Sequence, residues 1–246
     1  MRTSLFNKID TSSDFYDEVN RASKTGITLK TLFLLLLTVV PAAMVYLFLP
    51  KFLENDQLLA FYGLLIGSSI IALICGIAGR FDTRATKYLA VAYALAEGIG
   101  LGFITRLVEF YVPGAGLMAV GGTLLIFAVV FALYSFGVLK PSNKLFGIVM
   151  ALFIGALLLS IAQLIVYFTV ADAKTYLYIG VIISVVLLIE GTLSLTFNFA
   201  EADLVVNKGC SKNSEWCVAL GLAISVIFIY IEILRIILYV AELNRN

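Results

Sequence analysis

A series of long apolar runs, which begins near residue 31 and continues almost to the C-terminus, constrains the fold of this chain most strongly. An α-helix needs about 20 apolar residues to cross a hydrocarbon core of about 30 Å. Hydrophobic residues make up 61% of the sequence and charged residues only 13%. The sequence therefore predicts an all-α integral membrane protein, a bundle of seven transmembrane helices. The expected spans are Thr31–Leu49, Leu58–Ala78, Tyr88–Thr105, Leu117–Leu139, Leu145–Val170, Tyr176–Phe199 and Cys217–Val240.

The distribution of Lys and Arg predicts the orientation of these spans, because cytoplasmic loops carry an excess of both residues. Seven spans place twelve of the 17 basic residues on the side of the N-terminus, which we therefore expect to be cytoplasmic. Six spans, with Tyr88–Thr105 re-entrant, would place the loops at Lys140 and Lys208 outside. The twelve are Arg2, Lys8, Arg21, Lys24, Lys30, Arg80, Arg84, Lys87, Lys140, Lys144, Lys208 and Lys212. The remaining five are Lys51, Arg106, Lys174, Arg235 and Arg245.

Polar sequence is confined to the N-terminus and to short connections. The first 26 residues are polar and mix acidic with basic side chains. Connections of about five to sixteen residues are too short for a soluble domain. We divide the chain into a cytosolic tail, residues 1–26, and a seven-helix membrane domain, residues 27–243. The first apolar run is long enough to stay in the bilayer, so we expect no cleavable signal sequence.

Acidic and amide side chains lie in and beside these apolar runs, at Glu97, Glu190, Asn198, Glu201 and Glu232. A carboxylate in hydrocarbon costs about 2.5 to 3.5 kcal/mol even on the lenient insertion scale, so several of them indicate an ion or proton path. The spacing of Glu190, Asn198 and Glu201 puts them on one stripe of a helix, which must face the interior of the bundle.

Structural interpretations of these acids remain open. Glu232 and Arg235 have the i, i+3 spacing that permits a salt bridge. Glu97 could form a buried hydrogen bond between helices. The glycines that follow it, at 98, 100 and 102, indicate close helix packing, which small residues allow in membranes.

Enzymatic and metal-binding motifs are missing from the sequence. There is no His, and no pair of the three Cys has the spacing of a metal site, so we expect no resident metal or cofactor, apart from transient Ca²⁺. The sequence has no P-loop, nucleophile elbow, zinc-protease motif or dinucleotide fingerprint. We therefore expect a protein that is not an enzyme, in which carboxylates provide any response to pH.

Three segments resemble the Bax inhibitor family, the transmembrane Bax inhibitor motif proteins, and specifically their bacterial YccA-like branch. They are the stretch from Tyr93 to Gly98, the turn from Lys208 to Trp216, and Tyr230 to Arg235. The similarity runs from about Tyr16 to Val240, and the order and spacing of the segments carry it.

The resemblance implies a bundle in which the last helix is central, and a pH-sensitive calcium leak channel. In the family, an acidic pair between the sixth and seventh helices and an arginine on the second control the gate. Glu232 matches the seventh-helix acid and Arg80 the arginine, and Arg235 is a second candidate for the latch. The sixth-helix acid falls at Asn198, where this chain has an amide that cannot titrate.

Glu190 is the candidate to replace the missing acid. If the last two helices turn at about Gly209 to Ser214, Glu190 and Glu232 lie at similar depth, because each residue of a helix adds about 1.5 Å. Two such acids that face each other would share a proton near neutral pH.

The sequence thus predicts a pH-sensitive cation (calcium) leak channel, gated by protonation of intramembrane carboxylates. We expect it in the bacterial inner membrane, with the bilayer, calcium ions and protons as partners and no nucleic acid. The alternative is a regulatory protein that binds a membrane-bound protease, since YccA-like relatives are associated with one. A proton-coupled carrier is a third possibility, weakened by the lack of an inverted repeat.

Overall fold

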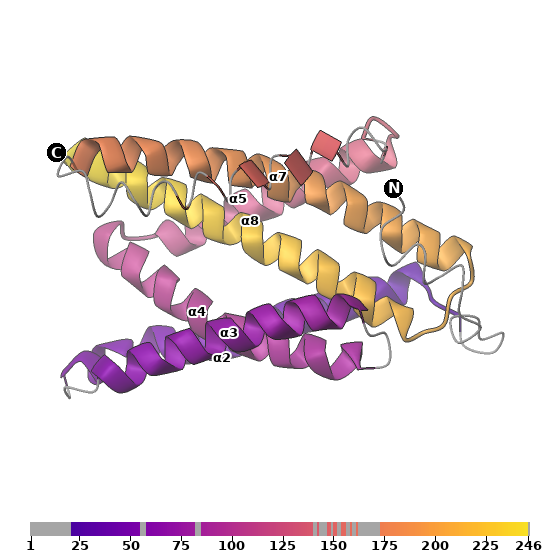
Figure 1. The fold of residues 1–246 in the computed structure, drawn as a ribbon, viewed down its shortest axis with the longest axis horizontal. Helices are drawn as coiled ribbons and strands as arrows, with labels where there is room; N and C mark the ends of the chain where they lie inside the picture. Colours follow the sequence, from indigo (N-terminus) through magenta and orange to yellow (C-terminus); the bar gives the residue numbers. More distant parts are fainter. Residues whose placement is uncertain are drawn as a thin grey trace. The chain divides into compact units, whose positions relative to one another are not determined.

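Helices form nearly all of the regular structure in the described part of the chain. The computed structural model describes residues 21–54, 58–81, 85–139 and 173–245, with scattered positions between 142 and 161. Its helices are α2 (Lys24–Glu54), α3 (Leu58–Phe81), α4 (Thr86–Tyr111), α5 (Ala115–Ser135), α7 (Ala173–Asn207) and α8 (Ser214–Arg245) (Figure 1). The only pairing of extended backbone among the described residues is an isolated bridge between Arg21 and Ser211. The prediction of an all-α protein is confirmed.

All six of these helices are long and apolar enough to cross a membrane. They contain six of the expected spans, apart from the last residues of the fourth. Most of the remaining span, Leu145–Val170, lies outside the described residues, although the described positions between 147 and 161 are helical. A multi-pass membrane protein is therefore confirmed, and the count of seven stays a prediction. The re-entrant interpretation of Tyr88–Thr105 is not supported, because α4 is one continuous helix of 26 residues.

A local hydrogen bond explains why α2 begins before its apolar run. At the start of α2, Ser23 Oγ accepts a hydrogen bond from Gly26 N–H at 3.0 Å, which satisfies a free donor of the first turn. The helix therefore begins at Lys24, inside the range that we assigned to the polar tail. Residues 21–23 of that tail are described, and residues 1–20 lie outside the described residues.

The end of α7 is fixed by a glycine in the left-handed region. Gly209 has φ 66°, a value that favours glycine. Cys210 N–H donates to Val205 O at 3.1 Å, and Gly209 N–H donates to Val206 O at 3.0 Å. These two bonds are those of a Schellman motif, which satisfies the last carbonyls of a helix. The turn between α7 and α8 is therefore 208–213, within one residue of the turn that the sequence predicted.

The chain divides into two compact units. Unit 1 is Met1–Arg106 with Asn198–Ile224, and unit 2 is Leu107–Phe197 with Ser225–Asn246. The helices α4, α7 and α8 each contribute residues to both units. Each unit is described by itself below.

In unit 1, glycines of α4 pack directly on the backbone of α2. A Cβ atom on Gly98 would overlap Thr38 O and the ring of Pro41, and one on Gly102 would overlap Ala42 O. No heavy atom lies within 4 Å of the corresponding position on Gly100. The prediction of close helix packing is confirmed for Gly98 and Gly102, because larger residues would separate the two backbones.

In unit 2, α8 packs against both α5 and α7. A Cβ atom on Gly191 of α7 would lie 2.8 Å from Phe228 Cδ1 and 3.3 Å from Ile229 Cγ1. On α5, a Cβ atom on Gly122 would lie 3.1 Å from Ile233 Cδ1. Small residues on the two partner helices thus face large side chains of α8.

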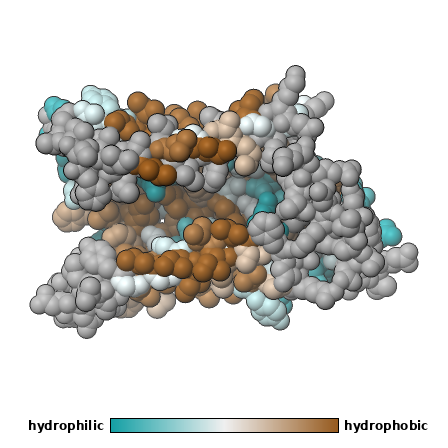
Figure 2. All heavy atoms as spheres, viewed as in Figure 1, coloured by the Kyte–Doolittle hydropathy of each residue, from teal (hydrophilic) through white to brown (hydrophobic). Residues whose placement is uncertain are grey.

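Burial distinguishes α8 from the other described helices. In the apolar part of α8, 67% of the residues are buried, compared with 17% in α2 and at most 39% elsewhere. Large hydrophobic side chains are instead exposed on α2, including Leu36 and Leu47. Figure 2 shows many such hydrophobic side chains on the viewed surface, as expected where a protein faces lipid tails.

Candidate ion path and latch

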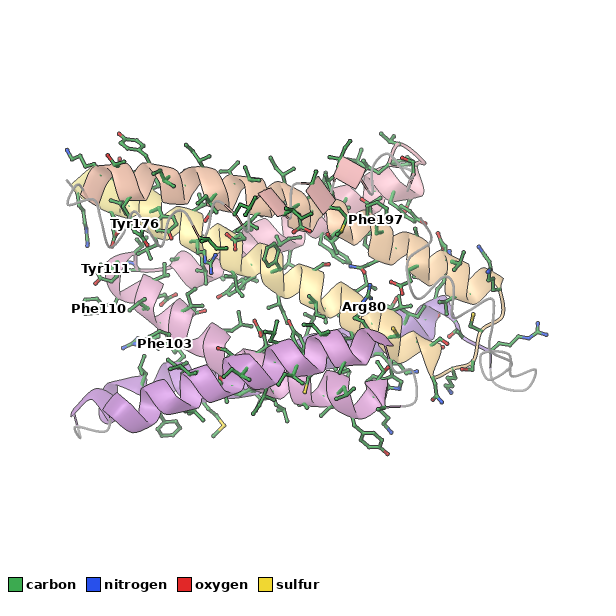
Figure 3. All side chains as sticks on the ribbon, in the orientation of Figure 1. Arg80, Phe103, Phe110, Tyr111, Tyr176 and Phe197 are labelled. Carbon is green, nitrogen blue, oxygen red and sulfur yellow. The ribbon has the colours of Figure 1, made fainter. Side chains whose placement is uncertain are left out.

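Arg80, in the last turn of α3, connects three helices of unit 1. Its Nη2 atom lies 3.2 Å from Glu201 Oε2 on α7, and its Nη1 atom donates to Cys217 O on α8 at 3.4 Å. Figure 3 shows the labelled Arg80 side chain. The sequence analysis placed Arg80 and Glu201 in the candidate site but did not predict that they pair.

Asn198 and Gly221 complete this group. Asn198 is buried, and its Nδ2 atom donates to Gly221 O at 3.1 Å, which joins α7 to α8. A Cβ atom on Gly221 would overlap Arg80 Nη1 and lie 2.8 Å from Asn198 Oδ1. Gly221 therefore provides the space that the guanidinium occupies. We call Arg80, Asn198, Glu201, Cys217 and Gly221 the latch cluster.

The Glu201 carboxylate depends on Arg80 for its charge balance. The Glu201 side chain is only 8% exposed. Its second oxygen, Oε1, is buried and has no hydrogen-bond partner among the residues that the structure describes. Loss of one partner from a buried ion pair leaves an uncompensated charge, which is strongly unfavourable. The latch cluster should therefore be sensitive to any change that moves Arg80 away.

Glu232, on α8 in unit 2, is the most buried of the predicted site residues. Its side chain is 1% exposed, and its Oε1 atom accepts a hydrogen bond from Arg235 Nη1 at 3.0 Å. The ion pair that the i, i+3 spacing permits is thus present. It involves only one oxygen, and Glu232 Oε2 makes no hydrogen bond of standard geometry within the described part of the chain, although the Ser184 hydroxyl lies beside the carboxyl group.

Glu190, on α7, lies near Glu232 in the same unit. Glu190 is buried, and its Oε1 atom accepts a hydrogen bond from Ser194 Oγ at 2.9 Å. The Glu232 carboxyl group interacts electrostatically with Glu190 and lies beside the Ser184 hydroxyl. The burial of Glu190, Asn198 and Glu201 confirms that their stripe faces inward. We call Ser184, Glu190, Ser194, Glu232 and Arg235 the acid cluster.

Glu97 stands apart from both clusters in its contacts. It is half-buried on α4 in unit 1, and it interacts electrostatically with Tyr93, one turn earlier on the same helix. Neither an ion-path role nor a hydrogen bond between helices follows from this arrangement, so its role stays a prediction.

The sequence analysis missed two features of unit 1. Gly221 was not among the predicted site residues, although a glycine within a transmembrane span is a signal of close helix packing. Glu215 was quoted only for the family resemblance, yet its side chain is 1% exposed and pairs with Lys30. An acidic residue in the first turn of a helix was the available signal, because it is favoured by the helix dipole.

A family model described as Bax inhibitor 1 like matches residues 4–242. No curated protein matches the chain.

Proposed function

The chain belongs to the Bax inhibitor 1 like family, and on this premise we propose that it is a pH-sensitive leak channel for cations such as calcium. Protonation of intramembrane carboxylates gates the channel in this proposal. The protein is not an enzyme, and it resides in the bacterial inner membrane with a cytoplasmic N-terminus and seven spans, as the YccA-like resemblance and the distribution of basic residues suggest.

The unsatisfied oxygen of Glu232 carries this proposal. A buried charged group without a full set of partners is costly, and the cost is relieved when a proton or a cation binds there. Glu190 is a second carboxylate within electrostatic range of Glu232. Carboxylate oxygens are the ligands that hard cations such as Ca²⁺ prefer. We therefore assign proton sensing and ion passage to the acid cluster.

The latch cluster suits the control of a closed state. Arg80 bonds from α3 to α7 and to α8, and Asn198 bonds α7 to α8. Any relative movement of these helices must break at least one of these bonds. The high burial of α8 supports a central position for this helix. Arg80 is then the latch, and Arg235 acts on the acid cluster alone.

Reconstitution tests the function directly. Purified protein in liposomes loaded with a calcium-sensitive dye should give a Ca²⁺ influx that exceeds that of protein-free liposomes. This influx should change with pH between about 5 and 8, a range in which desolvated carboxylates titrate. An influx equal to that of protein-free liposomes at every pH contradicts the channel. An influx that does not change with pH contradicts the gating.

Regulation of a membrane-bound protease remains the alternative function. The polar tail that would engage such a partner lies outside the described residues up to position 20. Co-purification that depends on this tail, together with no Ca²⁺ influx in liposomes, would favour the alternative.

A further inference from the structure

The segment that leads into α2 lies against the turn between α7 and α8, in unit 1. Arg21 and Ser211 form the isolated bridge, and Ala22 N–H donates to Cys210 O at 2.8 Å. Ala22 and Cys210 are both buried. Two parts of the chain that are far apart in sequence are thus joined through their backbones.

A buried carboxylate anchors this contact. Glu215, in the first turn of α8, is 1% exposed, and its Oε1 atom accepts hydrogen bonds from Ser23 N–H at 2.7 Å and from Ser23 Oγ at 3.3 Å. Its Oε2 atom pairs with Lys30 Nζ, a side chain that is 16% exposed. The carboxylate therefore has donors on both oxygens, from Ser23 just before α2 and from Lys30 within it.

The shape of the contact also depends on a glycine and a tryptophan. A Cβ atom on Gly26 would overlap the Glu215 carboxylate. Lys30 Nζ lies 5.1 Å from the centre of the Trp216 ring, close enough for a cation–π interaction, and also donates to Lys212 O at 3.2 Å. The α2 segment thus fits the turn by close packing as well as by charge.

This contact lies next to the latch cluster along both partner helices. Glu215 precedes Cys217, whose carbonyl accepts the hydrogen bond from Arg80, by two positions. Lys24 Nζ, at the start of α2, lies 2.6 Å from Oδ1 of Asp203 on α7. Asp203 follows Glu201 by two positions. The start of α2 is therefore bonded to α7 and α8 within one helical turn of the residues that Arg80 contacts.

We propose that residues 21–30 form a strap that holds the α7–α8 turn, and that release of its Glu215 anchor opens the latch cluster. The strap links the cytosol-facing start of the chain to the helices that carry the gate. The strap itself is defined by contacts within unit 1, and only its effect on Ca²⁺ influx rests on the proposed channel function.

Native cysteines report the opening of the strap. Cys210 lies under the strap and is 0% exposed, whereas Cys217 lies beside Arg80 and is 1% exposed. Burial raises the pKa of the Cys210 thiol, with a smaller opposing effect from Lys208, so the closed strap also suppresses the reactive thiolate. Cys75, buried on α3, serves as an internal reference.

The experiment measures the rate of maleimide labelling of each thiol in the full-length protein in detergent, by peptide mass spectrometry. Glu215→Gln, which removes the charge and keeps the shape, should label Cys210 and Cys217 about tenfold faster or more, because a bond to a charged group shifts a local opening equilibrium by about that factor. Cys75 labelling should not change. Lys30→Gln should act in the same way, and the double variant should label no faster than the faster single variant.

Three further variants separate loss of the strap from loss of charge and from steric effects elsewhere. Gly26→Ala disturbs the anchor without removal of a charge and should label the same two thiols faster. Lys24→Gln breaks the bond of the strap to Asp203 on α7, so it should also label the two thiols faster, but by a smaller factor than Glu215→Gln, because a largely exposed pair contributes less than a buried one. Gly63→Ala, where no heavy atom lies within 4 Å of the new Cβ, is the matched steric control.

The labelling pattern decides the proposal whether or not the protein conducts. Unchanged labelling in Glu215→Gln overturns the anchor. Faster labelling of Cys210 alone overturns the coupling between the strap and the latch cluster. Equal acceleration of all three thiols indicates general unfolding and overturns a local strap. In the unmodified protein, rapid hydrogen exchange at Ala22 and Ser23 would also overturn it. If liposomes with Glu215→Gln show a higher Ca²⁺ influx than those with wild type, the strap also acts on the gate. If neither wild type nor variant gives any influx, the channel function is contradicted but the strap is not.

Discussion

In the latch cluster, the buried Glu201 faces an arginine from another helix, whereas in the acid cluster the buried Glu232 faces an arginine on its own helix. The pair of Glu201 and Arg80 exists only while α3 and α7 hold their positions. The pair of Glu232 and Arg235 can persist in any arrangement of the helices, because a single turn of α8 fixes it.

This difference separates two tasks. An ion pair between helices responds to their movement, so it can hold a closed state. The ion pair within α8 does not depend on helix movement and leaves the second oxygen of Glu232 available. That oxygen can bind or release a proton or a cation while the pair stays intact. We therefore expect variants of the latch cluster to change the leak at every pH, and variants of the acid cluster to change how the leak depends on pH.

The largest effect should follow the substitution Arg80→Ala. The closed state would lose a charge-assisted bond worth about 1.5 to 3 kcal/mol, so the basal leak should rise about ten- to a hundredfold at every pH. Arg80→Lys, which keeps the charge and loses the fork of donors, should give a smaller rise. An equal or lower leak in Arg80→Ala would assign Arg80 to membrane topology alone.

A smaller rise in leak is expected for Gly221→Ala, because the new Cβ would displace the Arg80 guanidinium. Overpacking of this kind costs about 1 to 3 kcal/mol. Gly191→Ala, which meets only the apolar Phe228 and Ile229, is the matched variant in unit 2. It should lower the melting temperature in detergent without a rise in leak. Equal leak from the two variants would remove the distinction between the clusters.

In the acid cluster, Glu190→Gln should weaken the pH dependence of the Ca²⁺ influx as much as Glu232→Gln does. The double substitution should be no worse than either single one, because coupled groups titrate as a unit. A pH dependence as strong as that of the wild type, together with a lower melting temperature, would show that Glu190 only supports the packing of α7 through Ser194.

The smallest effect is expected for Asn198→Asp. The new carboxylate could not donate to Gly221 O, and it would add an acid near Arg80 and Glu201. The latch cluster would then itself titrate, so the leak should acquire a second, weaker dependence on pH. A pH profile identical to that of the wild type would indicate that the exchange of amide for carboxylate at this position does not affect gating.

The sequence predicted the helices and the inward stripe of α7 because both follow from local periodicity. Glu190, Asn198 and Glu201 are buried as their spacing required. The contacts of Arg80 could not be predicted in this way, because Glu201 and Cys217 lie on two other helices and only the packing of these helices brings them to the guanidinium. The pairing of Lys30 with Glu215 was missed for the same reason. Charges far apart in sequence carry no local signal of their contact.

The measurement that tests the account most directly is the pH profile of Ca²⁺ influx in liposomes that contain Glu232→Gln. This variant keeps the shape of the side chain and removes its titration, so the influx should lose most of its pH dependence while the protein remains folded. Glu242→Gln, farther along α8, is the matched control and should keep the wild-type profile. A Glu232→Gln profile with the wild-type midpoint and amplitude would contradict the assignment of proton sensing to the acid cluster.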